Sequence, residues 1–204
     1  MAFVMKDEIF TELKNLCCEM YEKGEILSCE KALMKLMDME GIPMHCPYHH
    51  FIMPTALLTV TAVQEKRDRK ELSDWLETAE ERAKTVPPGF CGNCGACGAA
   101  IGIGMFISIY TGGSPLSLEN WQWANEGTGR GLLAIAEYPG PRCCKRTTFL
   151  AARAGIPYIN EKCGLNLTIS DDIRCEYHDR NAQCLEEKCP FYQENCEEDS
   201  IESV

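Results

Sequence analysis

Apolar residues recur every three or four positions near the start of the chain, a spacing typical of amphipathic helices. The first such stretch covers residues 5–22 and stops before Gly24. A second follows Ser28, a favourable N-cap residue, and stops before Gly41. The pattern therefore predicts two helices in this part of the chain.

Three more helices are expected in the next seventy residues or so. Pro54 suits the first turn of a helix running to about residue 66, because that turn leaves its N–H groups unbonded. Charged and apolar positions mix over residues 69–85, which predicts a helix with a solvated face. Residues 97–113 are apolar but too few to cross a bilayer, so we expect a buried helix there.

The remaining pattern completes a mostly α fold of about six or seven helices. Ser117 precedes a helix that reaches about residue 138, and residues 143–154 form another that Gly155 ends. Residues 165–169 suggest one short strand. We expect a helical domain over residues 1–160, a small cysteine-rich, metal-stapled module over 161–196 and an acidic tail over 197–204.

Composition and charge exclude several classes of protein. Of 204 residues, 45% are hydrophobic, which excludes wholesale disorder, and the net charge of −11 argues against DNA binding. The N-terminal residues lack the apolar run of an export signal, so we expect a cytoplasmic protein without membrane attachment. In that reducing compartment, 14 cysteines favour metal or redox chemistry over structural disulfides.

The densest group of thiols is the C-x2-C-x2-C motif formed by Cys91, Cys94 and Cys97. Glycines between the thiols let backbone N–H groups turn toward the sulfurs. Soft ligands at close spacing with N–H donors are what an iron–sulfur cluster requires, and we expect a [4Fe–4S] cluster here. The alternative is a set of small core residues at a Gly-rich turn.

Two further segments contribute candidate residues to that central site. Cys143 and Cys144 lie among three cations, which would stabilise a thiolate or hold an anionic substrate. Adjacent side chains diverge at a helix start, so one cysteine is expected to be a ligand or redox partner while the other faces elsewhere. The second segment holds three of the four histidines together with Cys46, and histidine suits proton transfer near neutral pH.

The C-terminal cysteines form a separate group. Five candidate ligands follow the spacing C-x2-H-x5-C-x4-C-x6-C, namely Cys175, His178, Cys184, Cys189 and Cys196. A tetrahedral zinc site would staple a segment too short to hold a hydrophobic core. A second iron–sulfur cluster and free core thiols are the alternatives.

Four runs of the chain resemble a family of uncharacterised bacterial and archaeal proteins: MHCPYHHFIMPTALL, GFCGNCGACGAAIGIGMFISIYTG, PGPRCCKRTTFLA and IRCEYHDRNAQCLEEKCPFY. This family is a Cys-rich domain of unknown function, sometimes attached to radical-SAM or methyltransferase-like proteins. The resemblance carries the positions His49, His50, Cys97, Cys143, Cys144, Cys175, Cys184 and Cys189. Cys46 and Cys94 stand outside its pattern. A weaker likeness is to helical redox-active proteins with a C-GCAxxG-C-C pattern, and neither resemblance implies a reaction.

These observations favour a cytosolic iron–sulfur or metal-dependent enzyme of redox or sulfur chemistry, with a small-molecule substrate or a redox partner protein. The expected cluster ligands are Cys46, Cys91, Cys94, Cys97 and Cys143. The expected catalytic residues are His49 and His50 as acid or base, Cys144, and Arg142 and Lys145 as anion anchors. Two alternatives stay open: a dithiol redox protein without a cluster, and a noncatalytic metal-binding interaction module.

Overall fold

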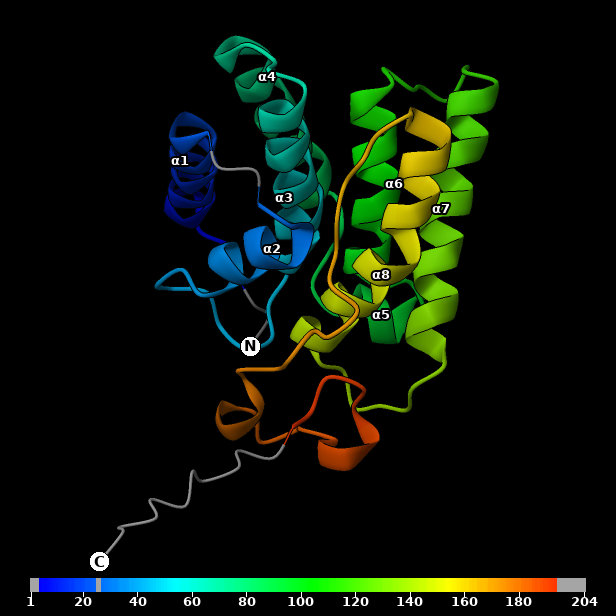
Figure 1. The fold of residues 1–204 in the computed structure, drawn as a ribbon. Helices are drawn as coiled ribbons and strands as arrows, with labels where there is room; N and C mark the ends of the chain where they lie inside the picture. The colour runs from blue at the N-terminus through cyan, green and yellow to red at the C-terminus, as the bar shows by residue number, and fades with distance from the viewer. Residues whose placement is uncertain (1–3, 25–26, 194–204) are drawn as a thin grey trace, which may run out of the picture.

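The computed structural model describes residues 4–24 and 27–193, and in this part of the chain the regular elements are all helices, without a strand (Figure 1). It contains eight α-helices, which confirms the mostly α class. They are α1 (Asp7–Lys23), α2 (Cys29–Met37), α3 (His49–Gln64), α4 (Arg69–Lys84), α5 (Phe90–Asn93), α6 (Gly98–Tyr110), α7 (Glu119–Ala136) and α8 (Cys144–Cys163). Two 3-10 turns follow, η1 (His178–Arg180) and η2 (Glu186–Lys188).

Helices α3 and α6 form the centre of the bundle because both are apolar on nearly every face. Helices α1, α2 and α4 pack on α3, while α7 and α8 pack on α6, and α3 and α6 pack on each other. Three buried threonines of α3 each donate a hydrogen bond to the carbonyl four residues earlier, so the hydroxyls of this helix are paired: Thr55, Thr59 and Thr61.

The chain after α8 returns along the bundle and folds at the end where α8 begins (Figure 1). Two aromatic residues of this segment, Tyr177 and Phe191, are fully buried. Phe191 packs edge-on against Phe149 of α8 with ring centroids 5.5 Å apart. The division into a domain ending at residue 160 and a module over 161–196 stays a prediction; Cys196 and the acidic tail lie outside the described residues.

The predicted start of α3 at Pro54 is wrong. The helix begins at His49, where the N–H of Ile52 already donates to the carbonyl of Tyr48 at 2.8 Å. Phe51 packs edge-on against Phe10, with ring centroids 5.2 Å apart, so burial of this extra turn outweighs the helix bond that Pro54 cannot make. The correction places the histidine pair on a helix.

The predicted end of α8 at Gly155 is also wrong, since the helix continues to Cys163 and ends at Gly164, which has φ 68°. Gly155 serves the packing of two helices instead. A Cβ at this position would lie 2.7 Å from Cδ1 of Ile103 on α6, so the helices approach closely only because residue 155 has no side chain.

The two glycines Gly155 and Gly129 allow a matched test of this packing. Both lie inside helices, but a Cβ at Gly129 would meet nothing within 4 Å. We expect Gly155→Ala to lower the free energy of unfolding by up to about 2 kcal/mol through overpacking. Gly129→Ala should raise it by up to about 1 kcal/mol through helix propensity. Urea denaturation measures both, and equal effects would contradict the role given to Gly155.

The strand predicted for residues 165–169 does not form. The side-chain amide of Asn160 donates to the carbonyl of Leu167 at 2.8 Å and accepts from its N–H at 2.9 Å. The carbonyl of Thr168 accepts from the N–H of Cys29 at 2.7 Å. Helix ends therefore satisfy the backbone groups that a neighbouring strand would have paired. Among the described helices, none is long and apolar enough to cross a membrane.

Candidate functional site

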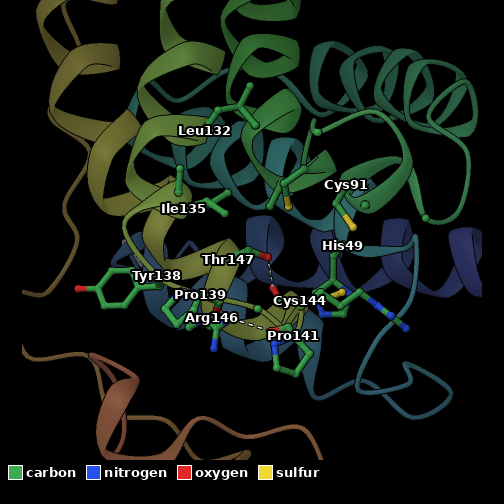
Figure 2. Close-up of a pocket in the computed structure, with 18 of the residues that line it drawn as sticks. His49, Cys91, Leu132, Ile135, Tyr138, Pro139, Pro141, Cys144, Arg146 and Thr147 are labelled. Carbon is green, nitrogen blue, oxygen red and sulfur yellow. Dashed lines mark hydrogen bonds between the residues drawn. The ribbon is translucent and has the colours of Figure 1, made fainter.

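A pocket of about 580 Å³ opens at the end of the bundle where α3, α6 and α8 begin. Figure 2 shows Leu132 and Ile135 of α7 on one side of it, with Cys91 and His49 on the other. The side chains with chemical function that line it are His49, His50, Cys91, Cys97, Arg142, Cys144, Arg146 and Thr147. Most of them come from the segments that the sequence singled out.

The electrostatic environment of this pocket favours an anion. Three helices present their N-termini to it, with His49 first in α3, Cys97 capping α6 and Cys144 first in α8. Helix N-termini carry partial positive charge on their unbonded N–H groups. Arg142 and Arg146 add full positive charges, and no Asp or Glu is among the described residues that line the pocket.

Burial holds two of the pocket thiols, those of Cys97 and Cys144, in the neutral form. Burial raises the pKa of Cys144 to about 12, and nearby Cys46 and Cys97 contribute to the shift. Burial also raises the pKa of Cys97, while hydrogen bonds from the Thr147 hydroxyl and from the backbone of Ala99 lower it. A bound cation would reverse this balance, because metal coordination deprotonates a thiol outright.

His49 lines the pocket and has one ring nitrogen without a hydrogen-bond partner. Its Nδ1 lies 3.1 Å from the carbonyl oxygen and 3.3 Å from Sγ of Cys46. An Nδ1–H that donates to this carbonyl leaves Nε2 as the acceptor, and Nε2 is buried without a partner in the described structure. Burial holds the pKa of His49 well below its usual value, so the ring is neutral and Nε2 is available as a base or a ligand.

His50 is fixed between two backbone groups. Its Nδ1 lies 3.2 Å from the carbonyl oxygen of Val86, and burial lowers its pKa. Its ring lies against the start of α6, where a Cβ on Gly98 would lie 1.9 Å from Cδ2 of His50. The glycine of the Cys97-Gly98 pair therefore makes room for the histidine.

Of the three cationic residues around Cys143 and Cys144, two line the pocket and one does not. Arg142 and Arg146 both line the pocket, and Arg146 is buried and donates from one terminal nitrogen to the carbonyls of Pro139 and Pro141, at 3.1 and 2.9 Å. Lys145 does not line the pocket. Its Nζ donates to the carbonyl of Met37 at 2.9 Å, and burial lowers its pKa to about 8, so its predicted part as an anion anchor finds no support in its position.

Three predicted cluster ligands lie outside the lining. Cys94 is exposed on the loop between α5 and α6, although its two neighbours in the motif line the pocket. Cys46 is buried behind His49 and donates from its thiol to the carbonyl of Pro43 at 3.5 Å. Cys143 caps α8 and faces away from the pocket, toward the C-terminal segment.

Cys143 belongs to a second group of thiols. It lines a small cavity of about 10 Å³ together with Cys175, Cys184, Cys189 and His178. Burial raises the pKa of Cys175 to about 11, and the thiols of Cys143, Cys189 and Cys184 contribute to this shift. The structure thus moves Cys143 from the central site to the C-terminal one, because the N-cap and the first helical residue point in different directions.

A chain of hydrogen bonds connects the two groups of cysteines. The N–H of Cys144 donates to Nδ1 of His45 at 3.5 Å, and Nε2 of His45 lies 3.1 Å from Oδ1 of Asn181. The amide nitrogen of Asn181 donates to Sγ of Cys143 at 3.6 Å. Nothing in the sequence pattern marked Asn181, which is also buried.

In the described structure, no three His, Cys, Asp or Glu side chains already converge into a metal-binding group. The iron–sulfur cluster and the zinc ion stay predictions. Three further residues that line the pocket, Thr147, Tyr138 and Leu132, were not predicted from the sequence. Thr147 lies one turn after Cys144 on α8, and that helical spacing is the signal in the sequence that could have identified it.

The bundle and its cysteine-lined pocket define an all-helical protein with thiol, imidazole and guanidinium groups gathered at three helix starts. The chain belongs to a family of unknown function (DUF5714), whose family model matches residues 13–192. This confirms the predicted membership of an uncharacterised family. No curated protein and no solved structure matches the chain significantly.

Proposed function

We propose that the central pocket is the active site of a metal-dependent enzyme of redox or sulfur chemistry, with a thiolate-bound iron–sulfur cluster and a small anionic substrate. One observation carries the proposal: three separate segments, which supply His49, the pair Cys91 and Cys97, and Cys144, line one pocket. This grouping favours a chemical role for the three thiols over a role in packing alone.

Three thiolates suit a cluster that keeps one iron open to substrate. Cys91, Cys97 and Cys144 would hold the cluster, and the partial positive charge of the helix N-termini would offset the negative charge on the sulfurs. Cys46, whose Sγ lies 3.3 Å from Nδ1 of His49, would be an alternative cluster ligand. When bound, the cluster would supply a Lewis-acidic or redox-active iron.

The other residues of the pocket would handle the substrate. Arg142 lines the pocket and would hold an anionic group. His49 would take or give a proton at Nε2, because its Nδ1 is engaged by Cys46 and its ring is neutral. Leu132 and Ile135 provide an apolar wall that would limit water around the reacting atoms.

Anaerobic purification with iron and sulfide analysis tests the proposal. The wild-type chain is expected to be brown and to contain iron and acid-labile sulfide in similar amounts. Cys97→Ser and Cys144→Ser should each lose most of the colour and iron, whereas Cys163→Ser, at the far end of α8, should keep them. Cys94→Ser should also keep them, because the Cys94 side chain is exposed and outside the pocket lining.

A colourless, iron-free protein after anaerobic purification and reconstitution would contradict the cluster. Retention of iron in the Cys97 and Cys144 variants would contradict the ligand set. Loss of iron in Cys94→Ser as well would show that the whole motif binds the metal after rearrangement of its loop.

A second candidate is a dithiol reductase that uses the same pocket without metal. The observation in its favour is the closeness of Cys97 to Cys144, whose thiol pKa it raises. The two thiols would reduce a substrate disulfide to two thiols and become a disulfide themselves, so that electrons and protons balance. A metal-free chain that loses two thiols on mild oxidation, but none in either serine variant, would favour this function over the cluster.

A further inference from the structure

We infer that Cys143, Cys175, Cys184 and Cys189 form a four-thiolate zinc site that fastens the C-terminal segment to the start of α8. This proposal is independent of the chemistry in the central pocket. It differs from the sequence-based set in taking Cys143, which lies 32 residues before Cys175 in the chain, in place of His178 and Cys196.

The fold brings the four thiols together from distant positions. All four line the same small cavity at the end of the bundle. Cys143 is held there as the N-cap of α8. The N–H of Cys175 donates to the carbonyl of Phe191 at 2.8 Å, and Phe191 is anchored on Phe149 of α8. The backbone therefore fixes the positions of the four residues around the cavity. Metal binding then requires only that their side chains rotate toward a common point.

Hydrogen-bond donors already point at two of the sulfurs. Sγ of Cys143 accepts from the N–H of Arg146 at 3.5 Å and from the amide of Asn181 at 3.6 Å. Sγ of Cys184 accepts from the N–H of Glu186 at 3.3 Å. Glu186 has φ 48°, a left-handed conformation that is costly for a residue with a side chain. The turn after Cys184 is thus held in a strained shape that brings an N–H to the sulfur.

The size and chemistry of the cavity favour a single zinc ion. A volume of about 10 Å³ accommodates one small atom but not a multi-iron cluster. Tetrahedral sites of four sulfurs are typical of structural zinc. Binding forms four Zn–S bonds and releases four thiol protons to solvent, and the buried guanidinium of Arg146 would partly offset the negative charge that results. His178 packs edge-on against Tyr192 instead, with ring centroids 5.1 Å apart.

Zinc content of the purified full-length chain tests the site. We expect one zinc per wild-type chain, and loss of that zinc in Cys143→Ser, Cys175→Ser, Cys184→Ser and Cys189→Ser. Cys163→Ser and His178→Ala should keep it. Cys144→Ser should also keep zinc, which separates this test from that of the central pocket.

Cobalt binding keeps the proposal testable where a serine variant does not fold. Co²⁺ added to the metal-free wild type should give the intense sulfur-to-cobalt absorption of a tetrahedral thiolate site. In Asn181→Ala, which keeps all four thiols, the affinity for Co²⁺ is expected to fall about 10–100-fold at unchanged stoichiometry. Absence of zinc and of cobalt–thiolate absorption in the wild type would overturn the proposal, as would zinc loss in His178→Ala with retention in any of the four cysteine variants.

Discussion

Raising the pH from 9 to 12 is expected to remove much of the stability of the folded chain, because two thiols are sealed inside the bundle. Cys17 and Cys29 are fully buried, and burial raises the pKa of each from 9.0 to about 12. The folded state therefore keeps these protons while the unfolded state releases them. The contribution of each thiol is complete below pH 9 and lost as the pH approaches 12, at about 4 kcal/mol each.

Urea denaturation at a series of pH values measures this loss. The control is a variant with Cys17→Ala and Cys29→Ala, which lacks both groups and should show a clearly shallower fall in unfolding free energy above pH 9. Its stability at pH 7 will be lower than that of the wild type, because each change leaves a small cavity. An equally steep alkaline fall in the variant would contradict the assignment to these two thiols.

The variants Cys184→Ser and Cys144→Ser should differ in how melting temperature and metal content change. A structural zinc in a small module contributes on the order of 10 kcal/mol to folding, so removing one ligand is expected to cost several kcal/mol. Cys184→Ser should therefore lower the melting temperature and the zinc content together. Cys144→Ser should empty the central pocket of its metal with a smaller change in melting, because that site is not needed to bury the core.

Anaerobic melting curves with metal analysis on both variants decide between these signatures. Cys163→Ser is the control for a thiol outside both groups, and it should melt and bind metal as the wild type does. If Cys144→Ser unfolds the chain while Cys184→Ser melts like the wild type, the division of labour between the two groups is reversed.

The helices were predictable where their signals are local. The periodicity of residues 5–22 and the glycine at position 24 define α1, and Asp68 caps α4 through the N–H of Glu71. The errors came from residues whose meaning depends on a distant partner. Gly155 signals a helix end in isolation, yet in the fold it is the point where Ile103 approaches α8.

The sequence predicted which residues are chemically important, but not which of them lie together in the fold. Spacing identified the motif at 91–97, the histidine pair and the C-terminal cysteines as chemically important. It did not indicate that Cys143, at the N-cap of α8, lies in the C-terminal group while Cys144 lines the central pocket. That division depends on where α8 begins and on the path of the chain after it. Cys94 shows the reverse, since ideal spacing leaves it exposed.

The adjacency of Cys143 and Cys144 couples the two proposed metal sites through the backbone. Consecutive Cα atoms are about 3.8 Å apart, so a restraint on one cysteine also restrains its neighbour. On the proposal above, zinc bound by Cys143 would reinforce the start of α8, where the fold already places Cys144. A shortage of zinc would then weaken metal binding in the central pocket without changing any residue of it.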